Sequence, residues 1–190
     1  WVANEDEGNA IWINSGQGTF LRAPQSLGSA ASFGVALGDL DGDGDPDAWV
    51  ANYAGQPDIV WLNDGSGVFG DAGQALGDTY SSGVALGDFD QDGDLDAWVA
   101  NALEPNAVWV NDGQGSFSSS GQTLGDNPSL AVALGDLDGD GDPDAWVAND
   151  GEPNTVWTTI VRGACCLDGN CVQLAREGCL DIVGTYVGGR

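Results

Sequence analysis

Short hydrophobic runs separated by glycine, asparagine and aspartate make up most of this 190-residue chain. In segments such as Gly34–Leu37 and Ala48–Ala51, apolar residues follow one another with no charged residue between them. Short apolar runs bounded by turn-forming residues favour β-strands over helices. Because both faces of these runs are apolar, we expect the strands to be buried between layers. The pattern predicts an all-β protein.

The same pattern recurs along the chain. The sequence Trp-Val-Ala-Asn starts at Trp1, Trp49, Trp98 and Trp146, so successive copies lie 48, 49 and 48 residues apart. A second motif with a central tryptophan follows each copy, at Trp12, Trp61, Trp109 and Trp157. All 8 tryptophans therefore occupy two repeat positions. We divide the chain into repeat units 1–48, 49–97 and 98–145 and a partial unit 146–157.

Each complete unit contains four predicted strands. In order they are the Val-Ala-Leu-Gly-Asp segment, the Asp-Ala-Trp-Val-Ala-Asn segment, the strand around the second tryptophan and a weaker strand near a phenylalanine. Asn-Asp-Gly at Asn63–Gly65 and Asn111–Gly113 indicates tight hairpin turns, since Asn and Gly tolerate the positive φ that such turns need. Four-stranded units of about 40–50 residues in tandem are typical of β-propeller blades. We predict blades of four antiparallel strands.

An acidic nonapeptide stands between the first two strands of each blade. The copies read DLDGDGDPD at Asp39–Asp47, DFDQDGDLD at Asp88–Asp96 and DLDGDGDPD at Asp136–Asp144. Five aspartates in each of the three copies account for 15 of the 30 acidic residues. Carboxylates this close repel one another unless a cation lies among them. These three segments, the Asp loops, are therefore the candidate metal sites.

The segment VALGDLDGDGDPDAWVAN resembles the FG-GAP-type repeat of integrin α-chain propellers and the related VCBS-type repeats of bacterial proteins. The likeness extends over residues 1–157, and the DxDxDGxxD core is present in all three Asp loops. It implies structural calcium and a scaffold for adhesion or for binding a protein or carbohydrate ligand. Such propellers usually close with about seven blades. Three complete loops therefore predict an open arc from a larger ring.

Calcium takes six to eight oxygen ligands in flexible geometry, which carboxylates on alternate residues can supply. We predict side-chain ligation by the first, third, fifth and ninth aspartates, a turn at the glycine in position six, and a backbone carbonyl ligand from the seventh, whose side chain stays free. In loop order these residues are Asp39, Asp41, Asp43, Asp45 and Asp47; Asp88, Asp90, Asp92, Asp94 and Asp96; and Asp136, Asp138, Asp140, Asp142 and Asp144. We expect one Ca²⁺ per loop.

Other interpretations of the Asp loops fit less well. An EF-hand closes with glutamate at position twelve, where this chain has Val50, Val99 and Val147. Magnesium demands stricter octahedral geometry, and zinc prefers His or Cys, whereas the chain has no His. Solvated acidic turns without any metal remain the competing interpretation.

Composition narrows the function classes. A net charge of −26 with 4 basic residues, all arginine, excludes binding to a nucleic-acid backbone. Without His or Lys the chain has no Ser-His-Asp or Cys-His arrangement and no Schiff-base lysine. A carboxylate pair could hydrolyse a glycoside, but the repeat accounts for nearly every carboxylate. No apolar run approaches the ~18 residues of a membrane span. We expect a protein that is not an enzyme.

We assign residues 1–160 to the repeat domain. Residues 161–190 differ from it and contain all 4 cysteines, Cys165, Cys166, Cys171 and Cys179. They resemble short Cys-rich modules of secreted bacterial proteins, which implies an oxidising compartment and disulfide bonds. Cys165 with Cys171 and Cys166 with Cys179, or the crossed pairing, are the alternatives, and a zinc knuckle is the competing interpretation. We expect this module to be truncated. The chain also opens within a repeat, so we expect further blades or domains of a longer secreted or cell-surface protein.

The predicted function is that of a calcium-binding extracellular scaffold for adhesion or ligand binding. The alternative is a non-catalytic region that presents polysaccharide to a catalytic domain of a larger secreted hydrolase or lyase, and a third possibility is a purely structural array. We expect most tryptophans in the core, with the Trp12 set partly exposed. Ligand contacts are expected where the units differ, at residues 5–9, 53–58, 102–106 and 150–154.

Overall fold

The computed structural model of the chain describes residues 1–4, 7–158, 165–167, 170–172 and 183–185. These residues form strands and turns, with no helix among them. No described segment is a helix long and apolar enough to cross a membrane. The strands are β1 (Asn9–Asn14), β2 (Phe20–Leu27), β3 (Ser32–Gly38), β4 (Asp47–Asn52), β5 (Ile59–Asn63), β6 (Phe69–Asp71), β7 (Ser81–Gly87), β8 (Asp96–Asn101), β9 (Ala107–Asn111), β10 (Phe117–Ser119), β11 (Ser129–Gly135), β12 (Asp144–Asn149), β13 (Thr155–Thr158), β14 (Cys165–Leu167), β15 (Asn170–Val172) and β16 (Val183–Thr185).

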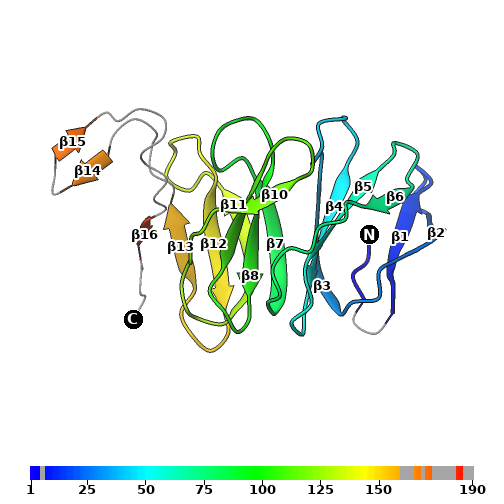
Figure 1. Cartoon of the computed structure of the whole chain (residues 1–190), viewed down its shortest axis with the longest axis horizontal. Coiled ribbons are helices and arrows are strands. Elements are labelled where there is room, and N and C mark those ends of the chain that lie inside the picture. The colour runs from blue at the N-terminus through cyan, green and yellow to red at the C-terminus, as the bar shows by residue number, and fades with distance from the viewer. Residues whose placement is uncertain (5–6, 159–164, 168–169, 173–182, 186–190) are drawn as a thin grey trace.

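Three four-stranded antiparallel sheets follow one another along the chain (Figure 1). Their strand orders are β3-β4-β5-β6, β7-β8-β9-β10 and β11-β12-β13-β16, and a β1-β2 pair precedes them. Each blade begins with the last strand of one sequence unit and continues with strands of the next. The predicted all-β fold with four-stranded blades is confirmed, and the described sheets form an open arc.

The third blade takes its outer strand from an unexpected place. Strand β16 lies in the segment predicted as a Cys-rich module, and its residues pair with β13 from Val156↔Thr185 to Thr158↔Val183. β14 and β15 form a separate two-stranded hairpin. The cysteine pairing itself concerns side chains outside the described part of the chain.

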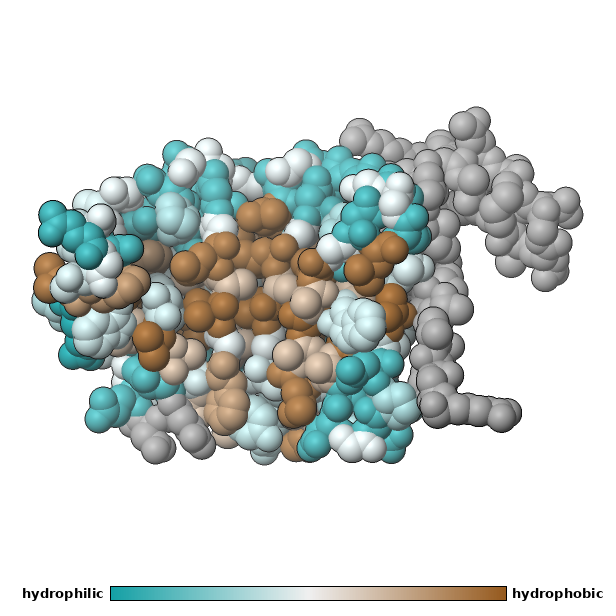
Figure 2. Space-filling view, turned by 180° about the vertical axis from the view of Figure 1, so that it is seen from behind, coloured by the Kyte–Doolittle hydropathy of each residue, from teal (hydrophilic) through white to brown (hydrophobic). Residues whose placement is uncertain are grey.

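The innermost strands β3, β7 and β11 lie side by side along the arc. Their close approach depends on glycine: a Cβ added to Gly34 would lie 3.0 Å from the Cα of Gly83. A real Cβ would force the two strands apart, so only glycine keeps this spacing. Figure 2 shows the molecule from behind, with a band of hydrophobic residues across its middle and polar residues above and below. Exposed hydrophobic residues of the inner strands include Phe33, Leu37 and Leu130.

The core lies between successive sheets and is built on the repeated tryptophans. Trp49 is 0% exposed and packs against the next blade, with its ring centroid 6.3 Å from Trp109 and 4.7 Å from Phe117. Trp98 is 1% exposed, which confirms the prediction of a core role for both. Trp146 occupies the same position in the last blade but is 49% exposed, because no described sheet covers that face. The core role predicted for this tryptophan set therefore fails at Trp146.

Candidate metal centres

The three Asp loops connect the first and second strands of the three blades. In the first blade, β3 and β4 pair as far as Gly38↔Asp47, so residues 39–46 form the connection between them. The register is equivalent at Gly87↔Asp96 and Gly135↔Asp144. All three loops consequently lie at the same end of the sheets, along the upper edge of Figure 1.

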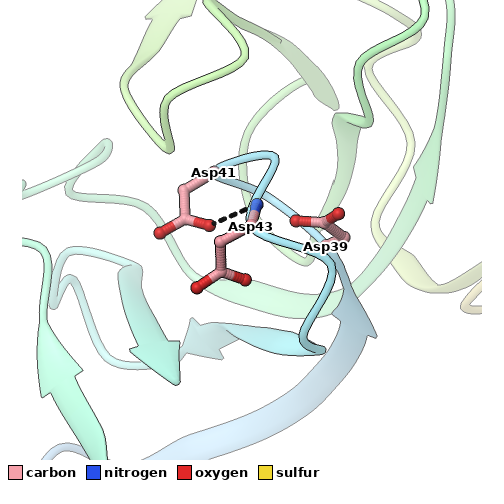
Figure 3. Close-up of side chains that lie close together, drawn as sticks. All are labelled: Asp39, Asp41 and Asp43. Carbon is pink, nitrogen blue, oxygen red and sulfur yellow. Dashed lines mark hydrogen bonds between the residues drawn. The ribbon is translucent and has the colours of Figure 1, made fainter. Parts of the chain in front are cut away.

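The first Asp loop folds around its own carboxylates. Oxygens of Asp39, Asp41 and Asp43 lie within 4.8 Å of one another (Figure 3). The amides of Gly42 and Gly44 donate to the two oxygens of Asp39 at 2.9 and 3.0 Å, and the amide of Asp43 donates to Asp41 Oδ1 at 3.2 Å. Gly44 has a φ of 93°, which fits the predicted sharp turn. The loop thus holds three carboxylates together without any basic residue.

The second and third loops gather a slightly different set. Here the first, third and ninth aspartates lie within 4.8 Å of one another, namely Asp88, Asp90 and Asp96, and Asp136, Asp138 and Asp144. The fifth aspartates, Asp92 and Asp140, lie outside these triads. In Asp140, Oδ2 is buried and has no hydrogen-bond partner among the described residues. A buried carboxylate oxygen without a donor is costly unless a cation neutralises it.

The seventh aspartates lie outside the triads and contact neighbouring turns. A Cβ on Gly65 would lie 2.5 Å from Asp45 Oδ2, and one on Gly113 would lie 2.3 Å from Asp94 Oδ2. The third member, Asp142, accepts a hydrogen bond from the side chain of Gln91 in the second Asp loop. These carboxylates therefore position the loops against their surroundings.

The ninth aspartate is the structural anchor of each loop. Asp47 is 0% exposed and accepts hydrogen bonds from the amides of Leu40 at 2.8 Å and Asn63 at 2.7 Å. Burial raises the pKa of Asp47 despite these hydrogen bonds, with a smaller contribution from nearby carboxylates. Burial likewise raises the pKa of Asp96 to about 6. A bound cation would favour the ionised form of both groups.

The first Asp loop also contacts the second blade. Asn111, at the end of β9, donates from Nδ2 to the carbonyl of Leu40 at 2.9 Å. A Cβ on Gly42 would lie 3.3 Å from the carbonyl oxygen of Gly113, so the loop packs directly against the turn that follows β9. The candidate metal site is thus part of the contact between two blades.

Comparison with known protein families identifies the repeat. The FG-GAP-like repeat matches residues 1–50, 39–99 and 88–147. The chain belongs to the FG-GAP-like repeat family. A comparison with curated proteins found no match. FG-GAP repeats often bind calcium. The aspartate clusters at equivalent places in the three repeats of this chain agree with its membership of the family.

The side-chain contacts made at two polar positions of the FG-GAP repeats were not predicted from the sequence. Asn63 and Asn111 donate to carbonyls of Pro46 and Leu95 in the Asp loop of their own blade. Gln74 accepts from the amide of Phe117 at 2.8 Å, in the outer strand of the next blade. Gln25 does the same for Phe69 at 3.0 Å. The recurrence of these residues in equivalent repeat positions is the signal that could have revealed them.

An open depression of about 430 Å³ lies between the second and third Asp loops. Asp88, Gln91, Asp136 and Asp142 are among the residues that line it.

The donors grouped at all three Asp loops are carboxylate oxygens, with no nitrogen or sulfur ligand in any of the three triads, which is the chemistry that calcium prefers. The residues present therefore fit this ion.

Proposed function

We propose that the chain is an extracellular ligand-binding scaffold of FG-GAP-like blades in which calcium has a structural role and no catalysis takes place. Its partners would be a protein or a glycan outside the cell. Calcium would be held by the triads of the three Asp loops. Further oxygens would come from the remaining predicted carboxylates, Asp47, Asp92 and Asp140, and from the backbone carbonyls of the seventh aspartates. The bound ion would neutralise carboxylates that otherwise repel one another.

The observation that carries this proposal is the contact of the first Asp loop with the next blade. Each loop joins two inner strands of one blade, and the first contacts the turn after β9 of the next. Calcium at this point would stabilise a strand connection and a blade contact together. Binding free energy at such a site becomes folding free energy. The ion would thus keep the opposite, variable loops in a fixed arrangement for binding.

Calcium stoichiometry tests the structural part of the proposal. Equilibrium dialysis followed by atomic emission should find one Ca²⁺ per Asp loop at millimolar calcium. Asp39→Asn, Asp88→Asn and Asp136→Asn should each remove one ion, because the amide keeps the shape of the side chain and removes its charge. Asp126→Asn, in an exposed turn, is the control and should leave the count unchanged. No calcium bound at millimolar concentration would refute the proposal.

Ligand binding tests the second part of the proposal, the role of the chain as a ligand-binding scaffold. The immobilised chain should retain a ligand from glycan and extracellular-protein arrays in calcium and release it in EGTA. Equal retention in both conditions would separate binding from calcium and contradict the proposed role of the ion.

A further inference from the structure

Three aromatic residues in the described part of the chain do not follow the repeat. All 8 tryptophans and Phe20, Phe69 and Phe117 occupy repeat positions, and Phe89 replaces a leucine of the other Asp loops. Among the described residues this leaves Phe33, Tyr53 and Tyr80, which come from three separate segments. They nevertheless form one cluster: the ring centroids of Phe33 and Tyr53 are 4.5 Å apart and stacked, and those of Tyr53 and Tyr80 are 5.0 Å apart and edge-on. We name these three residues the aromatic platform.

The aromatic platform lies at the end of the blades opposite the Asp loops. Phe33 is near the start of β3, and Tyr53 directly follows β4. In the β3-β4 register, Ser32 pairs with Asn52 and Gly34 with Ala51, so Phe33 is the extra residue of a β-bulge. A bulge redirects a side chain out of the regular sheet. Phe33 is accordingly 47% exposed.

The turn that follows Tyr53 has an unusual backbone conformation. Ala54 has a φ of 61° and Gly55 a φ of 69°. A positive φ is unfavourable for alanine, and strain of this kind is often found at functional sites. The turn is fixed to the preceding segment, since the amide of Tyr53 donates to the carbonyl of Ala31 at 2.7 Å and the amide of Ala31 donates to Gln56 Oε1 at 2.9 Å. Tyr53 is therefore held in place before any ligand arrives.

The surroundings of the platform are polar and include two acidic residues, Glu104 and Asp78. Glu104 accepts from the amide of Tyr80 at 3.4 Å, and Gln56 lies in the turn beside Tyr53. None of the described residues hydrogen-bonds the hydroxyl of Tyr53 or Tyr80. Half of the acidic residues, 15 of 30, belong to the Asp loops at the other end. The platform thus combines apolar ring surface with phenol, amide and carboxylate groups.

We propose that the aromatic platform is the binding site for a neutral saccharide, an inference that rests on the proposed role as a ligand-binding scaffold. The apolar face of a sugar ring would pack on the face of Phe33 that points away from Tyr53, which supports Phe33 by stacking on its other face. Sugar hydroxyls would bond to the phenols and to Glu104. The three rings contact one another directly and leave no gap between them that could enclose a cation. A net charge of −26 opposes anionic glycans.

The repeat supplies substitutions that should preserve the fold. Phe33→Ser places in the first blade the residue that the second has at Ser82, and Tyr53→Ala copies Ala102. Tyr80→Ala copies Ala31, which also precedes the first strand of a blade. Leu130→Ser is the matched control for Phe33→Ser, because Leu130 is the bulged residue of the third blade and lies outside the platform.

Calorimetric titration in calcium, with neutral hexasaccharides of glucose, mannose and N-acetylglucosamine and with hexa-arginine as probes, tests the proposal. At least one saccharide should bind, and Phe33→Ser and Tyr53→Ala should each weaken it about tenfold. Leu130→Ser should bind like the parent chain. Melting curves of the variants should match the parent, which separates lost contacts from lost folding.

Other outcomes overturn the assignment in distinguishable ways. Saccharide binding that survives both platform substitutions would keep the scaffold function and place its site elsewhere. Binding of hexa-arginine alone, lost in the variants, would assign the platform to a basic peptide. No binding of any probe by a folded, calcium-loaded chain would overturn the saccharide site, while the calcium measurement still decides the scaffold.

Discussion

A single buried carboxylate distinguishes the first blade from the second. Asp58 is 2% exposed and accepts hydrogen bonds from the amide of Asn52 at 2.8 Å and from Trp49 Nε1 at 3.2 Å. Its burial raises its pKa to about 7. In the second blade Asn106 takes this position and accepts from the amide of Asn101, while Trp98 Nε1 is buried without a partner. Asp58 therefore accepts a hydrogen bond from Trp49, whereas Asn106 leaves the equivalent tryptophan without a partner. In its ionised form, however, Asp58 places a charge in the core.

Asp58→Asn should remove a pH-dependent loss of stability. The pKa of Asp58 is about 7 in the folded chain against 3.8 in the reference state, so the folded chain binds more protons between these values. Stability must then fall as pH rises from about 4 to 7, and the loss is complete above pH 7. The free energy of unfolding of the variant minus that of the parent should therefore increase by about 2–4 kcal/mol from pH 4 to pH 8. Urea unfolding at both pH values in saturating calcium measures this difference.

The reciprocal variant provides the control for this prediction. Asn106→Asp gives the second blade a buried carboxylate beside Trp98 and should make stability fall more steeply with rising pH than in the parent. Parallel pH profiles for parent and Asp58→Asn would show that Asp58 does not titrate in this range.

At the scale of elements, the turns after the third strand of each blade support the Asp loops. Gly16, Gly65 and Gly113 occupy equivalent places with φ of 81°, 80° and 75°. A Cβ on Gly113 would overlap Asp94, whereas one on Gly16 would meet nothing within 4 Å. The first turn has no described Asp loop beside it, so it isolates the backbone effect from the contact with the loop.

Gly113→Ala should destabilise the chain more than Gly16→Ala does. Both variants place alanine at positive φ, which costs about 1–2 kcal/mol. Gly113→Ala must also displace Asp94, which should add about 1–2 kcal/mol and weaken calcium at the second Asp loop. Chemical unfolding and calcium titration of the two variants give the comparison. Equal losses of stability with unchanged calcium affinity would mean that the turn does not support the loop.

At the scale of the whole molecule, blades and Asp loops form one chain of contacts. The first loop contacts the second blade through Asn111, and Gln91 of the second loop contacts Asp142 of the third. The hydrogen bond from the amide of Phe117 to the side chain of Gln74 adds a further contact between neighbouring blades. We therefore expect the blades to unfold together and not one at a time.

Removal of calcium should lower the melting temperature of the whole arc. At millimolar calcium and an affinity typical of extracellular modules, each site should contribute about 1 kcal/mol, and three sites about 3 kcal/mol. Calorimetry should show one transition that shifts down in EGTA and returns when calcium, but not magnesium, is restored. An unchanged transition in excess EGTA would contradict a structural role for the ion.

The local parts of this architecture could be predicted from the sequence. Strands, turns and Asp loops depend on neighbouring residues, and their 48 to 49 residue recurrence exposes them even without structural data. The core role of Trp49 was predictable for the same reason. Trp146 shows the limit, because its sequence context is the same as that of Trp49 and only the absence of a described neighbouring sheet leaves it 49% exposed.

The all-β repeat, the blade strands and the aspartates that can hold calcium are all predictable from the sequence, because strand alternation, turn chemistry and loop spacing act over a few residues. Tertiary structure decided which aspartates meet, how Asn111 reaches Leu40, and that Phe33, Tyr53 and Tyr80 form one platform. These contacts join residues far apart in the chain. They depend on strand register, on a β-bulge and on how closely neighbouring sheets pack, none of which a local pattern specifies.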